Sequence, residues 1–240
     1  MPRRPHLPVL LCLAAPLLLV ACYFEPLNCV SGKGEEVERT FALNDFESIS
    51  LDVAARVFVT VDTTHQVVVR AQQNVIDELN LRVRGGELGI GRGRCINRSS
   101  GIEVLVTMPT VEGLTVNGSG EIRAETPFVS EELRLGVSGS GSIRVDTDAL
   151  MISSNITGSG NIDLSGTADS HKIDISGSGS VRAFDLITAR TEVRISGSGD
   201  ADVNVSDLLE VDITGSGSVT YEGTPQVDSR VTGSGRVRRR

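Results

Sequence analysis

Apolar and polar residues alternate with a period of two through most of the chain from Phe41 onward. Stretches such as ISLDVAARVFVTV, HQVVVRA and IEVLVTM are rich in Val and Ile and are bounded by Gly, Asn and Asp. This alternation puts every second side chain on one face of an extended segment, which is the pattern of half-buried strands. Only QNVIDELN, from Gln73 to Asn80, favours a turn or two of helix. The sequence therefore predicts an all-β protein.

The tripeptide Gly-Ser-Gly occurs seven times in the second half of the chain, at intervals of 18 to 21 residues. Its first glycines are Gly118, Gly139, Gly158, Gly177, Gly197, Gly215 and Gly233. Two positions before each of them stands a Val or an Ile, namely Val116, Val137, Ile156, Ile175, Ile195, Ile213 and Val231. A flexible Gly-Ser linker would not keep apolar residues at fixed offsets, so we interpret the repeat as a structural unit.

A unit of this length cannot bury an apolar face alone, so successive units are expected to stack at the parallel-strand spacing of about 4.8 Å. The sequence thus predicts a single-stranded parallel β-helix, or β-solenoid, in which each residue of the repeat lies above its copy. The uneven coil length favours the right-handed form over the stricter left-handed hexapeptide form. Glycine at two inward positions would let the wall bend sharply, and the serine between them would stack on its copies.

Charged residues alternate in sign from coil to coil at two offsets of the repeat. One row comprises Asp174, Arg194, Asp212 and Arg230, and the other comprises Arg144, Asp163, Arg182 and Asp202. Opposite charges on adjacent strands contribute roughly 0.2–1 kcal/mol each, so we interpret both rows as locks on the register. The alternative, an acid–base pair of an active site, would need carboxylates that are desolvated in a cleft.

The beginning of the chain has the pattern of an export signal. Arg3 and Arg4 precede an apolar run of 14 residues at 7–20, which is shorter than the roughly 20 residues of a membrane-spanning helix. The run ends in Leu-Val-Ala-Cys, which resembles a bacterial lipobox, so Cys22 is predicted to carry the lipid that attaches the protein to a membrane. An ordinary signal peptide with a chance cysteine is the alternative. Tyr23, in place of an aspartate, favours the outer membrane.

These features divide the chain into three parts. We expect a lipoprotein signal peptide at 1–21, a lipidated tether at 22–40, and a parallel β-helix domain at 41–240. Within that domain, 41–113 would form upstream coils and 114–240 the Gly-Ser-Gly coils.

Of the four cysteines, Cys12 would leave with the signal and Cys22 would be lipidated. Cys29 and Cys95 are then the remaining pair in an exported, oxidising setting, and we predict a disulfide between them. Two separate buried thiols are the alternative.

The upstream half and the repeat together resemble a known family. FALNDFESISLDV, VVVRAQQNVIDELNLRVRGGELGI and VLVTMPTVEGLTVNGSGEI, followed by the Gly-Ser-Gly coils, are similar to the head GIN domain of auto-transporter adhesins. The resemblance runs from Phe41 to Val237, and its most specific part lies between Met108 and Gly120. It implies a parallel β-helix on a lipoprotein of the bacterial cell envelope, and it supplies no catalytic residues. A lipobox in place of a translocator barrel departs from a true autotransporter.

Candidate catalytic and metal-binding residues are scarce. Beyond the signal, histidine occurs only at His65 and His171, which we interpret as surface residues, and no cysteine spacing suits zinc. GSGDAD is similar to a calcium-binding repeat, but its Asp200 has no aspartate counterpart in the other coils. The serines lack a Gly-x-Ser-x-Gly elbow. The sequence therefore predicts no cofactor, no metal and no catalytic residue.

Charge and composition narrow the function further. Cleavage before Cys22 would remove two of the 23 basic residues and leave 31 acidic ones, a formal charge of −10, which argues against a nucleic-acid partner. We predict a membrane-anchored, non-catalytic scaffold of the cell envelope, adhesin-like, with a protein or glycan ligand. A carbohydrate-active β-helix enzyme, either a polysaccharide lyase or a hydrolase, is one alternative. Short coil connections and the absence of Trp disfavour it. A periplasmic structural factor is the other.

The last coil carries a cluster of arginines, Arg236, Arg238, Arg239 and Arg240. Charge on an exposed strand edge opposes end-to-end pairing, and that is the favoured interpretation. Contact with anionic lipid or lipopolysaccharide is the alternative.

Overall fold

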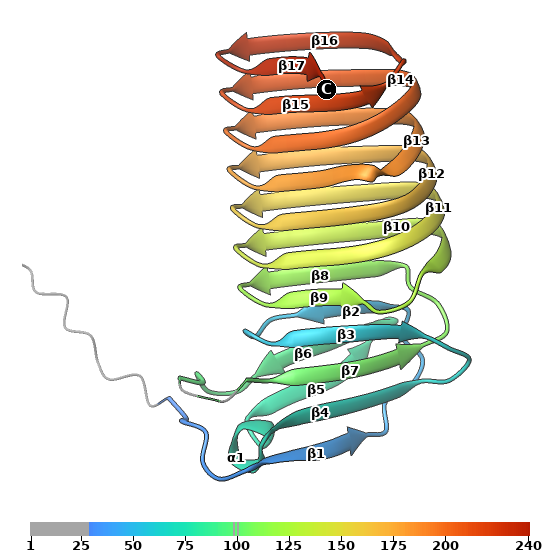
Figure 1. Cartoon of the computed structure of the whole chain (residues 1–240). Coiled ribbons are helices and arrows are strands. Elements are labelled where there is room, and N and C mark those ends of the chain that lie inside the picture. The colour runs from blue at the N-terminus through green and yellow to red at the C-terminus, as the bar shows by residue number, and fades with distance from the viewer. Residues whose placement is uncertain (1–28, 98, 100) are drawn as a thin grey trace, which may run out of the picture.

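The structure is a computed structural model that describes residues 29–97, 99 and 101–240. The predicted signal peptide, Cys22 and the start of the predicted tether lie outside the described residues. Figure 1 shows an upright stack of coils that stands on a less regular base. The boundary between the two falls where the Gly-Ser-Gly repeats begin.

The stack is built from long strands that follow one another in sequence order. They are β10 (Phe128–Gly139), β11 (Ser142–Gly158), β12 (Asn161–Gly177), β13 (Ser180–Gly197) and β14 (Asp200–Gly215), each paired in parallel with the next. The last complete coil consists of β15 (Ser218–Gly223) and β16 (Gln226–Gly233), and β17 (Arg236–Arg239) pairs with β15 as the start of a further coil. Each coil forms two walls that meet at a Gly-Ser-Gly corner on one edge (Figure 1).

The register of the stack is the predicted one. Ile175 pairs with Ile156 of the coil before it and with Ile195 of the coil after it. The exposed fractions of these three side chains are 0–2%. Val231, in the last coil, is 40% exposed because no described coil covers it. The predicted β-solenoid is confirmed, whereas its hand stays a prediction.

The core is a narrow apolar layer between the two walls. Side chains alternate between buried and exposed along much of the covered strands of the stack. One wall contributes Ile143, Ile162 and Val181 to the core, and the other contributes Ile156, Ile175 and Ile195. Burial of one such side chain stabilises the fold by about 1.5–3 kcal/mol. Because the same position is apolar in every coil, this layer continues through the whole stack.

The base departs from sequence order. β2 (Ser48–Leu51) lies between β6 (Glu87–Arg92) and β8 (Gly113–Gly118), and it is parallel to both. In the opposite wall, β3 (Arg56–Val61) lies in the same way between β7 (Glu103–Met108) and β9 (Glu121–Ala124). A coil from early in the chain is therefore inserted between coils formed by later residues.

Antiparallel strands close the lower end of the molecule. β4 (Gln66–Gln72) pairs with β7 and with β1 (Glu36–Phe41), and β5 (Leu79–Arg84) pairs with β6. The predicted helical segment begins with α1 (Gln73–Ile76), between β4 and β5. Residues 36–40, which the sequence analysis assigns to the tether, belong to β1.

Candidate binding surfaces

The disulfide between Cys29 and Cys95 is present, as predicted. Next to it, the amide of Val30 donates to the carbonyl of Cys95 at 2.8 Å, and the amide of Asn97 donates back to Val30 at 2.9 Å. Closing a loop of 66 residues contributes about 4 kcal/mol by chain entropy. The beginning of the described chain is thereby fastened to the segment that follows β6.

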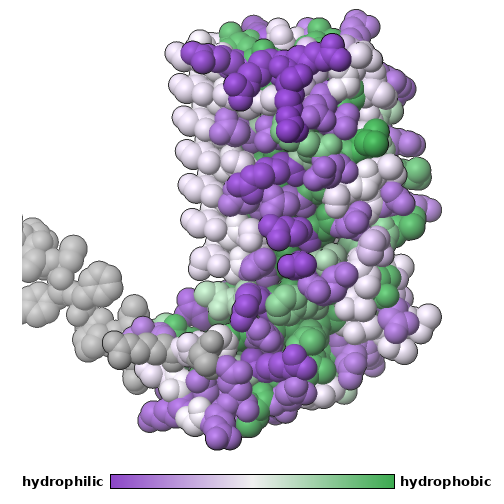
Figure 2. Space-filling model, in the orientation of Figure 1, coloured by the Kyte–Doolittle hydropathy of each residue, from purple (hydrophilic) through white to green (hydrophobic). Residues whose placement is uncertain are grey.

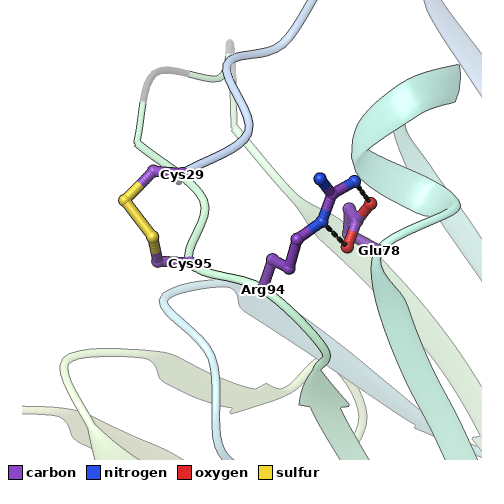
Figure 3. The surroundings of a disulfide bond; sticks show 4 residues. All are labelled: Cys29, Glu78, Arg94 and Cys95. Atoms are coloured by element: carbon purple, nitrogen blue, oxygen red, sulfur yellow. Dashed lines mark hydrogen bonds and ion pairs between the residues drawn. A yellow bond between two sulfur atoms is a disulfide. The ribbon is translucent and has the colours of Figure 1, made fainter. Parts of the chain in front are cut away.

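An ion pair lies beside the disulfide, as Figure 3 shows. Arg94 donates two hydrogen bonds to the carboxylate of Glu78, and this contact lowers the pKa of the Glu78 carboxyl. Arg94 directly precedes Cys95, and Glu78 lies just before β5. The pair therefore joins the disulfide segment to the entry of the β5–β6 hairpin.

The charge rows of the stack have the predicted register. Asp163 lies between two arginines, with its Oδ2 3.0 Å from Arg144 Nη2 and its Oδ1 2.8 Å from Arg182 Nη1. In the other row, Arg194 Nη1 lies 4.0 Å from Asp174 Oδ1. Figure 2 shows hydrophilic residues running from the base to the top along the wall that faces the viewer. The arginines are largely exposed, so we interpret these contacts as locks on the register and not as an acid–base pair.

Asp202, at the end of its row, differs from the other carboxylates. Partial burial raises the pKa of its carboxyl, and the nearby Asp200 raises it further. A hydrogen bond with Thr220 and the positive charges of Arg182 and Arg238 act in the opposite direction. These opposing effects are the smaller ones, so the pKa of the Asp202 carboxyl stays above its ordinary value, and we interpret Asp202 by its register as the end of the charge row.

His171 contradicts the interpretation of both histidines as surface residues. It is 2% exposed, and its Nε2 lies 2.9 Å from the hydroxyl oxygen of Ser154 inside the stack. Burial lowers the pKa of the imidazole to about 3, so the ring is neutral near pH 7. His171 pairs with Ile152 and Thr191 in the coils on either side, both of which point inward. Reading its position in the repeat, instead of its residue type, would have placed it in the core.

His65 is half-buried in the base, so the surface interpretation is also wrong there. Its Nε2 lies 2.9 Å from the carbonyl oxygen of Phe46, and the two rings meet edge to face with centroids 4.7 Å apart. Among the described residues, no group of three or more His, Cys, Asp or Glu side chains is placed to hold a metal ion. The histidines therefore contribute packing and hydrogen bonds.

The glycines of the repeat are required by the stacking of the coils. Gly139 has φ +121°, and a Cβ there would lie 2.6 Å from the carbonyl oxygen of Gly118 one coil away. A Cβ on Gly179, a second glycine of the tripeptide, would lie 2.5 Å from Ile156 Cγ2. The serine between the two glycines is exposed. This corner forms the even, pale column at the left of Figure 2.

Two glycines in the base are not required in this way. A Cβ on Gly89 would approach nothing nearer than the carbonyl oxygen of Arg82 at 3.6 Å, and one on Gly91 nothing nearer than that of Asn80 at 3.8 Å. Both distances are ordinary van der Waals contacts, and neither residue has a positive φ. Glycine at these positions therefore leaves open space on the outer face of β6.

That space is a groove of about 510 Å³, which we call the hairpin groove. Its lining is polar and consists of Asp52, Asn80, Arg82, Arg84, Glu87, Gly89, Gly91 and Arg92. Arg82 Nε donates to Asn80 Oδ1 at 3.0 Å. Arg82, Arg84 and Arg92 make no ion pair within the part of the chain that the structure describes.

A second depression of about 440 Å³ shares Asp52 and Arg92 with the hairpin groove. It extends past Cys95 to Asn117, whose side-chain amide donates to Asp52 Oδ1 at 2.7 Å. The two depressions together follow the outer face of β6 from the hairpin tip toward the disulfide. This surface is not among the features predicted from the sequence. Its signal lies in LRVRGGELGIGR, where arginines alternate along one strand and glycines interrupt the next.

Within the described residues, the structure contains no helix that is long and apolar enough to cross a membrane.

The family model described as "Putative auto-transporter adhesin, head GIN domain" matches residues 45–225. The chain belongs to this family. Its description indicates a protein of the cell surface or cell envelope. No curated protein matches the sequence.

Solved structures share the fold of this head GIN domain protein. A "putative adhesin" from Bacteroides fragilis is 19% identical with a TM-score of 0.84, covering 88% of this chain and 100% of its own. A "putative lipid binding protein" from Parabacteroides distasonis is 23% identical with a TM-score of 0.76, covering 88% and 99%. A "putative adhesin" from Parabacteroides merdae is 22% identical with a TM-score of 0.71, covering 88% and 98%. At these identities the likeness shows the fold alone.

Proposed function

We propose that this protein is a lipoprotein of the cell envelope, anchored by a lipid on Cys22, that acts as a non-catalytic, adhesin-like binding scaffold. The observation that carries the proposal is the division of the molecule. A stack of coils in regular register stands on a base that has an open polar groove. The family description and the Parabacteroides distasonis relative, named for lipid binding, both favour binding over catalysis.

On the walls of the stack, the paired charges and the buried histidine support a non-catalytic role. Asp163 lies between two arginines, Asp174 lies within 4.0 Å of Arg194, and His171 is buried in the core. A polysaccharide lyase or hydrolase would need titratable groups that converge on a substrate groove. The enzyme alternative is tested by incubating the protein with acidic polysaccharides. Release of unsaturated or reducing ends would contradict the proposal.

The lipid anchor is tested with Cys22→Ala, and Cys12→Ala serves as the matched control within the predicted signal. We expect the wild type and the Cys12 variant to partition into the detergent phase of a phase separation. The Cys22 variant should move to the aqueous phase, because the acyl chains supply the membrane affinity. Partition of all three into the detergent phase would rule out this anchor.

Outer-membrane display is tested by adding protease to intact cells. We expect the β-helix domain to be cleaved or shed while a periplasmic marker protein stays intact. Protection of the domain until the outer membrane is permeabilised would instead favour the periplasmic structural factor.

A further inference from the structure

Ion pairing separates the arginines of the base into two groups. Five of them contact a carboxylate, namely Arg39, Arg56, Arg70, Arg94 and Arg123. The other three in the described part of the base, Arg82, Arg84 and Arg92, have no carboxylate partner there, and all three line the hairpin groove. The groove also contains the carboxylates of Asp52 and Glu87, so its formal charge is 3 − 2 = +1 in a chain with 31 acidic and 23 basic residues, and it attracts anions locally.

The glycines of this groove point to the close approach of a ligand. Glycine weakens the interior of a strand, and it often marks a place where a ligand comes near the backbone. The corner glycines of the stack have a steric reason for their identity, whereas Gly89 and Gly91 have room for a Cβ. Because Gly89 and Gly91 have no side chains, the floor of the groove is lower than its edges, which carry the arginines.

We propose that the hairpin groove binds a segment of an acidic polysaccharide, with Arg82, Arg84 and Arg92 holding its carboxylates. This inference rests on the proposed function, for which it supplies the ligand class. A guanidinium group pairs with a carboxylate through two parallel hydrogen bonds, which suits uronate groups. Arg82 and Arg84 project from the same face of β5, about 7 Å apart along the strand.

The rest of the lining fits the hydroxyl groups of such a chain. The carboxylates of Asp52 and Glu87 accept hydrogen bonds, and the amide of Asn80 can donate and accept them. β6 extends the groove over about 17 Å, so an elongated ligand fits better than a compact one. No aromatic ring lines the groove, so recognition depends on charge, and neutral glycans should not bind.

A membrane surface fits the groove less well than a polysaccharide. A protein that lies on a bilayer inserts apolar side chains beside its cationic ones. The exposed large hydrophobic residues among those described are Val37, Val129, Leu150, Met151, Ile187, Val227 and Val231. None of them lines the hairpin groove.

The test uses the mature protein purified in detergent, with polygalacturonate oligosaccharides as the probe and a neutral glucan of matched length as the control ligand. Isothermal titration calorimetry should detect binding of the polygalacturonate alone, weakening as salt is added. The double variant Arg82→Gln/Arg84→Gln should lose about 100-fold in affinity, since each charge-assisted contact accounts for about tenfold. Its melting temperature should match that of the wild type.

The matched control is Arg236→Gln/Arg239→Gln, which removes two exposed arginines at the far end of the stack and should change affinity less than twofold. Gly91→Val should keep the melting temperature and weaken binding, because its side chain occupies the floor. Three results would overturn the proposal: no binding of polygalacturonate, equal binding of the glucan, or undiminished affinity in the Arg82/Arg84 variant. Binding to phosphatidylglycerol vesicles without binding to polygalacturonate would overturn it in favour of lipid. The anchor and display assays above do not use this ligand, so their failure is distinguishable.

Discussion

The stack and the base cover the apolar faces of their strands in different ways. In the stack, a residue such as Ile175 is covered by its own copies, so every position has a partner of known type. In the base, strands pair out of sequence order and partly antiparallel, so side chains meet unlike neighbours. Repetition leaves little free chemistry on the walls. The irregular base, by contrast, has two glycines with room for a Cβ, and they lie in one groove with three arginines that make no ion pair among the described residues.

The largest difference between the stack and the base is expected when one glycine of each is replaced by alanine. Gly177→Ala should destabilise the protein by at least about 4 kcal/mol, because φ is +125° and the added Cβ would meet the rigid backbone of Gly158. Gly91→Ala should leave stability unchanged or raise it by up to about 1 kcal/mol. Thermal unfolding of the two variants measures the difference. Equal losses of stability in the two variants would show that the stack glycine has no steric requirement that the base glycine lacks.

The disulfide ties the irregular region together, and its removal should have the next largest effect. Cys29→Ser/Cys95→Ser is expected to lower the free energy of unfolding by about 2–4 kcal/mol, since the unfolded chain regains the freedom of a long loop. Denaturant titration, compared with reductant-treated wild type, checks the value. If the variant and the wild type unfold at the same denaturant concentration, the loop is held by other contacts.

The buried imidazole predicts a pH dependence that belongs to the stack. The pKa of His171 is about 3 in the folded state against 6.5 in the unfolded state, so the unfolded chain binds the additional proton. Its contribution to stability is present above pH 6.5 and is lost as the pH falls toward 3. Between pH 7 and pH 5 the loss amounts to about 2 kcal/mol.

His171→Leu should remove this part of the pH dependence while leaving that of the surface carboxylates. The comparison is made by denaturant titration of both proteins at pH 7 and pH 5. An identical decrease in stability for the wild type and the variant would mean that the ring is protonated in the folded state.

The smallest expected effect concerns the charge rows. Arg194→Asp would place an aspartate in register with Asp174 and Asp212, and the repulsion should cost about 1 kcal/mol. The melting temperature should fall accordingly, and the difference from wild type should shrink in high salt. An unchanged melting temperature at low salt would show that the charge rows do not stabilise the register.

Repetition also explains which parts of the structure could be predicted from sequence. The register of Ile156, Ile175 and Ile195 follows from spacing alone, because a stack must align its copies. The disulfide followed from elimination among four cysteines. The inward position of His171 follows from the same alignment, because Ile152 and Thr191 occupy its place in the neighbouring coils.

The base could not be derived in the same way. Alternation shows which face of β2 is buried, but not that β6 and β8 flank it, because pairing between distant segments leaves no periodic trace in one sequence. The hairpin groove was missed for the same reason. Asp52 and Gly91 line one wall only after β2 and β6 have come together.

The insertion of the β2–β3 coil between later strands has a consequence for how the chain is made. During synthesis β2 and β3 emerge long before β8 and β9, so their apolar faces lack one covering neighbour until about residue 124 has left the ribosome or the export channel. The carboxyl-terminal coils can then pair one after another with the folded base. We therefore expect the non-local pairs of the base to form more slowly than the pairs between successive coils of the stack.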